Sequence, residues 1–545
     1  MSGPPIIKFT LSSIAGSVTL HRAPQYTWTT SYALLGLGLF VLQVTAWSIW
    51  TLVLWPRYFS PLRHLPQAPN ENLLWGQFLY ITNSESGVPH RDWEANIPND
   101  GLIRYTGLFR HERLLVTSPK GLSEVLSHKS YEFGKPQALI GGIKRLLGVG
   151  ILLAEGEEHK IQRRNLQPAF AFRHIKDLYP VFWSKTQEFI DALTQTVTEE
   201  ARSENGSPPS AVVEMPDWCS RVTLDIIGLA GFGKDFGAIK DPNAELAATY
   251  RKVFRLGGGE KIWRLMFLLI PFWLLSRLPM RRNRDINQAA EVIKRIGRDL
   301  IQERKAKLEK GQEIGHDILS VALQSGGFSD ANLVDQLMTF LAAGHETTST
   351  SLTWAVYLLC KYPDCQRRLR EEIRGKLQSI DDPTPMTAAE IDQLPYLHAV
   401  CNEVLRFFPP VPVVFRDAIS SNSTILGTPV PRGTRIVLAP AAINRSTALW
   451  GDDAGEFNPD RWMGPGLANT GGAESNYAFL TFLHGPRGCI GSSFSRSEFA
   501  CILAGIVGRF EMELADKDHK LKVTSSLTSK PEGGLQVRMT VLDGW

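Results

Sequence analysis

The chain has 545 residues, of which 43% are apolar and 21% are charged, the proportions of an ordinary folded protein. Its formal net charge of +4 is small for this length, so the composition shows no footprint of nucleic-acid binding. The six cysteines form no CxxC pair and have no histidines at zinc-finger spacing. This argues against a disulfide scaffold or a zinc finger and favours a reducing compartment. Length alone permits about two to four domains, or one large helical enzyme domain.

The first pronounced feature along the chain is an uncharged, apolar segment. Residues 23–56 carry no charged side chain, and residues 33–55 are dominated by Leu, Val, Trp and Ala. A helix over residues 33–55 would be roughly 34 Å long, enough to cross a bilayer core. It is longer than the apolar region of a signal peptide, and no A-x-A-like cleavage site follows it. We therefore predict one transmembrane anchor over residues 33–55, with a buried core helix as the alternative.

The segments on either side of this anchor complete the predicted domain organisation. Residues 1–32 form an N-terminal segment, residues 56–70 a proline-rich linker and residues 71–545 the globular body. The spacing of the prolines makes the linker stiff. Basic residues flank the anchor on both sides, Lys8 and Arg22 before it and Arg57 and Arg63 after it, so the charges do not decide its orientation.

The body is predicted to be mainly α with small β-sheets, an α+β fold. Short β-rich stretches punctuated by Gly and Pro occur over residues 102–116 and 424–438. The longest helical pattern begins after Ser329, a good N-cap, and runs to about Tyr362, where Pro363 stops it. The apolar segment over residues 262–278 is either core or a surface that dips into a membrane. Because no nicotinamide or flavin fingerprint is present, a redox enzyme of this sequence would receive its electrons from another protein.

One cysteine lies in a glycine-rich loop with the features of a thiolate metal ligand. The loop runs from Phe482 to Gly491 with the sequence FLHGPRGCIG. Its glycines permit a tight turn that aims N–H groups at the Cys489 sulfur, and the helix expected to follow favours a negative sulfur through its dipole. Arg487 is placed to pair with an anionic group, and Phe482 to cover one side of the loop. Taken alone, a single cysteine in such a loop is usually a free buried thiol.

The loop resembles the haem loop of the cytochrome P450 family, F-x-x-G-x-R-x-C-x-G. All five fixed positions of that pattern are matched, by Phe482, Gly485, Arg487, Cys489 and Gly491. The resemblance implies a haem b whose iron takes Cys489 as its axial ligand, because a thiolate donates electron density that favours O–O cleavage. It also implies the cytochrome P450 fold for the body. Three further motifs in the family's order extend the resemblance to the C-terminus.

The first of these motifs, AGHETT, lies in the middle of the long helix over residues 343–348. Proton delivery to a dry oxygen-activating site requires an acid beside a hydroxyl. Thr347 can donate back to the carbonyl of Ala343, and Gly344 weakens the same turn. The resemblance makes Glu346 and Thr347 the catalytic proton-relay pair. Without the Cys489 loop, an exposed acid and a satisfied hydroxyl would be the simpler interpretation.

The second motif pairs an ExxR sequence with a downstream arginine. Glu403 and Arg406 lie three residues apart on one predicted helix face and can pair, although such pairs are common on solvated helices. The segment FNPDRW follows in the family's order and contains Arg461. The resemblance joins these three residues in a buried structural triad that serves folding and haem retention rather than catalysis.

The third group consists of candidate partners of the haem propionates. His159 stands where family members commonly carry Trp, and Arg163 follows it at the family's spacing. Arg416, beyond a proline-rich segment, matches another propionate-binding arginine of the family. Doubly anionic haem edges favour guanidinium forks, so all three are expected to contact the propionates. Ordinary surface charges are the alternative.

The resemblance implies a haem–thiolate monooxygenase that inserts one oxygen atom into an apolar or amphipathic small molecule, as in fungal secondary metabolism. Electrons would come from NADPH through NADPH–cytochrome P450 reductase, steered by a basic surface that begins with His159 and Lys160. The expected location is the endoplasmic reticulum membrane, with a single pass, a lumenal N-terminal segment and the body in the cytosol. The expected substrate pocket is lined by Ala342, Ala343, Val411 and Val414.

Two other functions compete with this one. A haem–thiolate isomerase or dehydratase acts on peroxides without external electrons. Such enzymes typically lack the acid–threonine pair, so Glu346 and Thr347 argue against it. A non-catalytic membrane haem sensor or carrier would need no proton relay at all.

Overall fold

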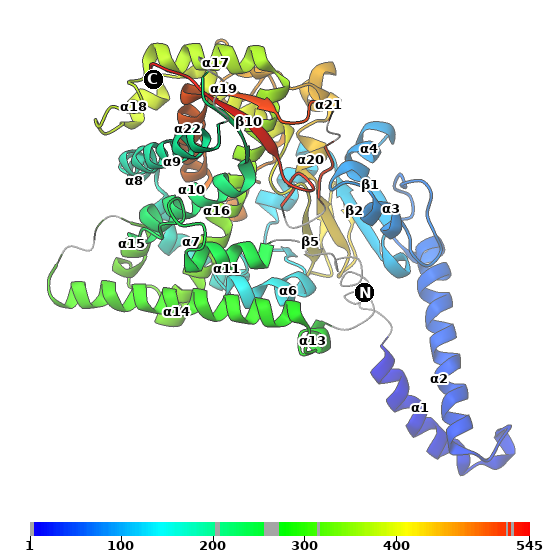
Figure 1. The fold of residues 1–545 in the computed structure, drawn as a ribbon. Helices are drawn as coiled ribbons and strands as arrows, with labels where there is room; N and C mark the ends of the chain where they lie inside the picture. The colour runs from blue at the N-terminus through cyan, green and yellow to red at the C-terminus, as the bar shows by residue number, and fades with distance from the viewer. Residues whose placement is uncertain are drawn as a thin grey trace. The chain divides into compact units, whose positions relative to one another are not determined.

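The computed structural model describes residues 5–201, 208–254, 272–312, 315, 317–518, 521–524 and 528–545. The chain divides into two compact units. Unit 1 comprises Met1–Ser84, Val88–Gly134 and Phe415–Ala439, and unit 2 comprises Glu85–Gly87, Lys135–Val414 and Pro440–Trp545. Most of the apolar segment over residues 262–278 lies outside the described residues. Figure 1 labels the elements of both units.

Unit 1 combines two long N-terminal helices with a mixed β-sheet. Its helices are α1 (Ile6–His21), α2 (Tyr32–Ile49), the π-helical η2 (Trp50–Phe59), α3 (Phe78–Asn83), α4 (Val88–Asn96) and α5 (Pro119–Ser123). Its strands are β1 (Leu102–Thr106), β2 (Glu112–Val116), β3 (Phe133–Gly134), β5 (Val414–Ala418), β6 (Thr424–Ile425), β7 (Thr428–Pro429) and β8 (Arg435–Leu438). The sheet order is β1-β2-β8-β5-β3, with β1 antiparallel and β8 parallel to β2, while β6 and β7 form a separate hairpin. The β-rich stretches predicted from the sequence are therefore confirmed.

The helix that contains the predicted anchor extends beyond it. It covers Tyr32–Phe59, is 28 residues long and is mostly exposed. Pro56, which was expected to open the linker, lies inside its π-helical end. A proline ring clashes with the carbonyl four residues earlier in an α-helix, and the wider π turn moves that carbonyl away. The helix that is apolar and long enough to cross a membrane is therefore longer than residues 33–55.

Unit 2 is mainly helical and contains the long helix that the sequence predicted. Its helices are α6 (Gln137–Leu147), α7 (Gly156–Leu166), α8 (Phe172–Lys176), α9 (Tyr179–Glu200), α10 (Met215–Phe232), α11 (Glu245–Phe254), α13 (Phe272–Leu275), α14 (Arg281–Glu309), α15 (Ile318–Gln324), α16 (Asp330–Lys361), α17 (Pro363–Lys376), α18 (Ala388–Asp392), α19 (Pro395–Phe407), α20 (Pro440–Ile443), α21 (Thr447–Trp450) and α22 (Ser492–Arg509). Strands β4 (Ser210–Glu214), β10 (Gln536–Val541) and β9 (Phe510–Leu514) form an antiparallel sheet in that order.

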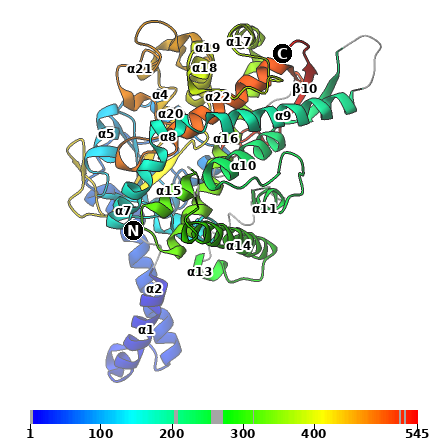
Figure 2. The same cartoon turned by 90° about the vertical axis from the view of Figure 1, so that its left-hand side faces the viewer.

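Helix α16 is the centre of unit 2. The Ser329 hydroxyl caps it by accepting from the Asn332 N–H over 3.3 Å, and Pro363 follows its end. It packs against α10 and α14 and also contacts α22, which in turn packs on α9 (Figure 2). Trp354 on α16 and Phe499 on α22 are fully buried in the resulting core. The long helix thus lies beside α22, the helix that follows the Cys489 loop.

Candidate active site

The Cys489 loop is a tight turn closed by its own backbone. Gly485–Arg487 form a single 3₁₀ turn, and the Cys489 N–H then donates to the Phe482 carbonyl over 2.8 Å. Gly485 has a φ of +73°, which glycine adopts without strain because it lacks a Cβ. Helix α22 begins three residues after Cys489, so its N-terminal dipole favours a negative sulfur.

The Cys489 thiol is accessible, and positive groups border it. The dense protein around the sulfur raises the pKa of Cys489, while the Gly491 N–H and the nearby Arg163 act against that rise. The Arg163 guanidinium also donates to the Gly488 carbonyl over 2.5 Å, which ties α7 to the loop. The residue is therefore accessible to a ligand, and the Gly491 N–H and Arg163 partly offset the rise in its pKa.

Basic side chains gather around His159, which lies on α7 together with Arg163. Arg487 is buried and forms an ion pair with Glu155, and the Lys135 ammonium lies 3.4 Å from the same carboxylate. Burial, together with the charges of Lys135, Arg487 and Arg163, lowers the pKa of His159 to about 4. His159 is therefore neutral at physiological pH. The cluster of Lys135, Arg163 and Arg487 against the single acid Glu155 carries a net positive charge.

Phe482 is held in the loop by contacts of its backbone and of its ring. Its carbonyl accepts the Cys489 N–H, and the guanidinium carbon of Arg496 on α22 lies 4.9 Å from the centre of its ring. Burial lowers the pKa of Arg496 to about 10. The stacking of a cation on an aromatic ring fixes Phe482 against α22, a contact that the sequence did not predict.

Other predicted site residues lie on β5, on α16 and after α19. Arg416 lies buried on β5 in unit 1 and donates to the Phe415 carbonyl over 2.9 Å. Ala342 is buried and Ala343 half-buried on α16. Val411 and Val414, which follow α19, are half-buried. The propionate role of Arg416 and the substrate contacts of the apolar residues stay predictions.

The acid–threonine pair lies near the middle of α16. The Thr347 hydroxyl donates to the Ala343 carbonyl over 2.8 Å, the bond that the sequence predicted. The neighbouring Glu346 is only 5% exposed, and the C-terminal segment holds it in place. Its carboxylate accepts from the Thr528 hydroxyl over 3.0 Å and from the Lys530 ammonium over 2.7 Å. Since the Lys530 side chain is 31% exposed, Glu346 connects the interior to a group in contact with solvent.

The surroundings of Glu346 are dense and aromatic. Burial is the main cause of a lowered pKa of His345, which the charge of Glu346 partly offsets. Burial and then Glu346 raise the pKa of Tyr250, whose ring meets that of His345 edge-on with centroids 4.6 Å apart. A Cβ at Gly344 would lie 3.0 Å from Ile227 of α10. Gly344 thus allows α10 to approach α16 closely, and Glu346 lies where bulk water has little access.

Helices α16 and α22 are joined by side chains next to the relay pair. The hydroxyls of Thr348 and Ser495 lie 3.1 Å apart. Ser495 begins the second turn of α22, and its N–H donates to the Gly491 carbonyl over 2.8 Å. One hydrogen bond therefore links the residue after Thr347 to the helix that begins at the Cys489 loop.

Glu498 lies on α22 next to Thr348 and Cys501 and is fully buried. Burial raises its pKa well above the ordinary value for glutamate, so the folded state binds its proton more tightly than the unfolded state does. We expect this contribution to stability to be complete below about pH 4.3, the unfolded pKa, and to be lost as pH rises through the folded pKa. Thermal midpoints measured against pH should fall less steeply for Glu498→Gln than for the wild type. Parallel profiles would show that Glu498 titrates normally.

The predicted structural triad is present at one end of α19. Arg406 and Glu403 are both 0% exposed and form two hydrogen bonds of 2.7 and 2.8 Å. The Arg461 Nε lies 3.7 Å from Glu403, whose carboxylate also accepts from the Trp462 indole over 2.9 Å. The third guanidinium nitrogen of Arg406, Nη1, donates to the carbonyls of Asn444 and Ala454. The carboxylate oxygens of Glu403 and the guanidinium nitrogens of Arg406 therefore all have hydrogen-bond partners, whereas the buried Arg461 Nε lies beyond hydrogen-bond distance of Glu403 and contributes by its charge.

Removal of the Glu403 charge should destabilise the fold strongly. Glu403→Gln leaves the buried Arg406 charge uncompensated, which typically costs ~3–5 kcal/mol. We expect a lower thermal midpoint and loss of bound haem on mild heating. The matched control is Glu371→Gln, which breaks the exposed pair between Arg367 and Glu371 and should leave the midpoint unchanged. Equal midpoints for both variants would contradict a structural role of the triad.

Comparisons with known proteins agree with this geometry. The family model for cytochrome P450 matches residues 66–539. The chain belongs to the cytochrome P450 family. It is 48% identical over 503 residues to cytochrome P450 monooxygenase sphH of Aspergillus fumigatus, with 91% of each chain covered. It is 43% identical to cytochrome P450 monooxygenase ALT8 of Alternaria alternata, covering 92% of this chain and 93% of that protein. It is 44% identical to cytochrome P450 monooxygenase FUM15 of Gibberella moniliformis, with 90% of each covered.

The residues of this P450 monooxygenase fit the haem that its family binds. Among the described residues, no three His, Cys, Asp or Glu side chains gather to hold a metal ion. The accessible thiol of Cys489 would hold the iron. The positive cluster of Lys135, Arg163 and Arg487 would hold the propionates, and the neutral His159 can add a hydrogen bond.

Several contacts of the site were not predicted from the sequence. Lys135 and Glu155 complete the charge cluster, but neither residue belongs to the family motifs that the sequence matches. Thr528 and Lys530 hold Glu346 from a segment far away in the sequence, since 182 positions separate Thr528 from Glu346. The contact of Trp462 with Glu403 could have been predicted, because Trp462 follows Arg461 directly in the sequence.

Proposed function

We propose that this P450 monooxygenase inserts one atom of dioxygen into a C–H bond of an apolar or amphipathic small molecule. The substrate R–H, dioxygen, two electrons and two protons would yield R–OH and water. The observation that carries the proposal is the pair of Glu346 and Thr347 on α16, which the Thr348–Ser495 contact joins to α22. A haem that only rearranges a peroxide has no need of protons from such a pair.

The bound haem would supply the dioxygen chemistry, in which electron donation by the thiolate favours cleavage of the O–O bond. The chain's own residues would perform the remaining tasks. Cys489 holds the iron, and the Thr347 hydroxyl presents a proton inside the site. Glu346 replenishes that proton, and Lys530 connects it to solvent. Ala342, Ala343, Val411 and Val414 would line an apolar pocket that binds the substrate and excludes water.

The electrons are proposed to come from NADPH through NADPH–cytochrome P450 reductase. Helix α8 contacts α22, the helix that begins after the Cys489 loop. A short 3₁₀ turn connects α7 to α8, and both helices pack on it. Exposed basic residues line these two helices, namely Lys160, Arg164, Arg173 and Lys176. A basic surface attracts an acidic electron donor. The membrane anchor would place the body in the cytosol at the endoplasmic reticulum, where such a reductase could reach it.

The biological setting is proposed to be the biosynthesis of a fungal secondary metabolite. The support is the likeness to P450 monooxygenases of filamentous fungi, which covers about nine-tenths of the chain. Comparison of the metabolites of a deletion strain with those of its parent would identify the substrate as the compound that accumulates.

The reaction class is tested with the full chain in microsomes, NADPH, reductase and an extract of the deletion strain. Oxygen and NADPH should be consumed while a compound of the extract gains one oxygen atom, and labelled dioxygen should deliver its label to the product. Turnover of a hydroperoxide without NADPH would instead support the isomerase or dehydratase. A protein that binds haem but consumes neither NADPH nor peroxide would be the sensor or carrier.

A further inference from the structure

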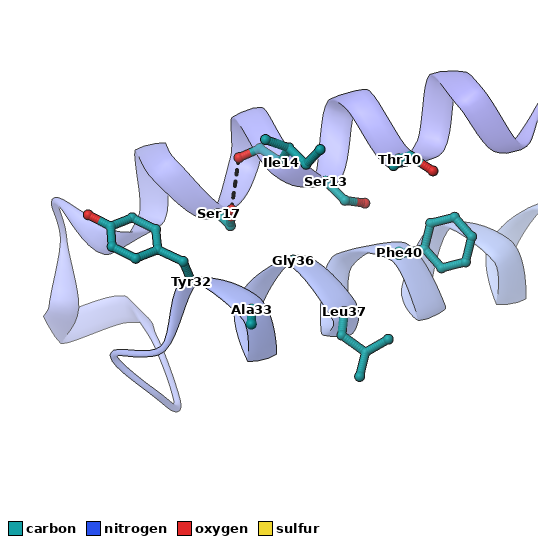
Figure 3. A pocket seen from close by; sticks show the side chains of 9 residues that line it. All are labelled: Thr10, Ser13, Ile14, Ser17, Tyr32, Ala33, Gly36, Leu37 and Phe40. Atoms are coloured by element: carbon teal, nitrogen blue, oxygen red, sulfur yellow. Dashed lines mark hydrogen bonds between the residues drawn. The ribbon is translucent and has the colours of Figure 1, made fainter.

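Helices α1 and α2 form an antiparallel hairpin at the start of unit 1. A connection over residues 22–31 joins them, and Figure 3 shows the groove between them with Ser13 and Ser17 of α1 facing Gly36 of α2. Although α1 has 16 residues, the sequence alone did not predict this helix. The pairing determines on which side of a membrane the chain begins.

Small residues let the two helices approach closely. A Cβ at Gly16 would lie 2.8 Å from the Leu39 side chain, and a Cβ at Gly36 would lie 3.8 Å from the Cβ of Ser17. Helices that meet in a bilayer depend on such small residues, because lipid offers no hydrophobic force to hold them together. This interface is therefore suited to lipid as well as to water.

A polar side chain in the middle of α2 depends on α1. Gln43 accepts from the Ser12 hydroxyl over 2.7 Å and donates to the Ser13 hydroxyl over 3.0 Å. In hydrocarbon, an amide without such partners costs several kcal/mol. If α2 crossed the bilayer alone, Gln43 would face lipid, and α1 provides the partners that remove this cost.

The outer surface and the tip of the hairpin match a bilayer. Many outward side chains of both helices are large and apolar, among them Leu11, Val18 and Leu42. At the tip, Trp28 is 70% exposed, and the Tyr32 ring stacks on His21 with centroids 3.9 Å apart. Aromatic side chains of this kind collect at membrane–water interfaces.

We propose that α1 and α2 insert into the bilayer together as a helical hairpin, so that the N-terminus emerges on the same side as the catalytic body. This rests on the membrane anchorage proposed above and replaces the single pass with a lumenal N-terminus. Helix α1 is roughly 24 Å long, close to the thickness of ~27 Å of the endoplasmic reticulum core. Lys8 in its first turn can extend its ammonium to the near surface, and Arg22 at the tip reaches the far one.

The pairing itself is tested by cross-linking in microsomes. The distance of 3.8 Å between the Ser17 Cβ and a Cβ at Gly36 is that of a disulfide. A variant with Ser17→Cys, Gly36→Cys and a protease site in the connection should, after oxidation and cleavage, keep its tagged N-terminal fragment attached until reductant is added. The control pairs Gly36→Cys with Leu11→Cys, since Leu11 is 63% exposed, and should release the fragment. Release from the first variant, or retention by both, would overturn the pairing.

The topology is tested with an N-terminal tag that carries an epitope and a glycosylation acceptor, together with a C-terminal epitope. In intact microsomes the hairpin predicts that protease removes both epitopes and that the N-terminal acceptor stays unmodified. A glycosylated, protected N-terminus would overturn the hairpin while leaving the anchor intact. Carbonate extraction separates the two failures, because a chain released from the membrane would refute the anchorage as well. The ferrous–CO spectrum of each protein confirms that its body is folded.

Discussion

Replacement of Cys489 by serine is expected to abolish the long-wavelength ferrous–CO band that gives the P450 family its name, and all turnover with it. A neutral serine hydroxyl donates much less electron density to iron than a thiolate does, so the axial donation that favours O–O cleavage is lost. The loop should survive the change, because its turn is closed by the Cys489 N–H and the Phe482 carbonyl. Product formation should fall to background.

The matched control is Cys365→Ser on α17. Like Cys489, Cys365 is a free cysteine, and it is partly exposed. Because it lies outside the loop, its variant should keep both the ferrous–CO band and the activity. Circular dichroism and thermal midpoints of the two variants should be alike. Persistent turnover in Cys489→Ser would show that another residue binds the iron and would refute the assignment of this site.

The long helix was predictable because its ends are local. Ser329 caps α16 and Pro363 ends it, and both effects act within one turn of the chain. Helix α1 was not predictable, because its stretch SSIAGSVT is rich in small and β-branched residues. Isolated short helices of such composition are marginal in water. Helix α1 is stabilised by contacts with α2, whose residues lie too far along the chain for a local sequence pattern to reveal them.

The same distinction between local and distant contacts separates the predicted from the unpredicted parts of the site. The spacing of Glu403 and Arg406 is local, and the pair is found in the structure. Lys530 lies far from Glu346 in the sequence although the two side chains form an ion pair, and no pattern near the C-terminus predicted this contact. The pairing of Arg487 with an anionic ligand group stays a prediction, and the structure adds an ion pair with Glu155 that the sequence did not predict. A sequence pattern names the charged group but not the neighbour that the fold provides.

Removal of the Thr347 hydroxyl is expected to uncouple NADPH consumption from product formation. Thr347→Val keeps the branched shape on α16 but loses the hydroxyl that donates to Ala343. A positioned proton donor contributes typically about 10²–10⁴-fold to a rate, so product formation should fall at least about 10²-fold. The electrons should instead leave as hydrogen peroxide, which a peroxidase assay measures beside NADPH and product. Thr347→Ser restores the hydroxyl and should restore much of the coupling.

The control for Thr347 lies on the same helix. Thr353 is buried and makes the same kind of bond, to the Ser349 carbonyl over 2.8 Å, so Thr353→Val removes an equivalent hydroxyl away from the relay. Its coupling should equal that of the wild type. If both valine variants uncoupled alike, the effect would come from a disturbed helix rather than from proton delivery.

Glu346→Gln distinguishes the acid from the position that it occupies. Glutamine can still accept from Thr528, but it carries no exchangeable acid and no charge for Lys530. If Glu346 replenishes the proton of Thr347, this variant should lose turnover to a similar extent as Thr347→Val, and the double variant should lose little more, because residues that act in one relay are not additive. Additive losses would mean that the two side chains act independently, and the connection from Lys530 through Glu346 to Thr347 would then not be the path of the proton.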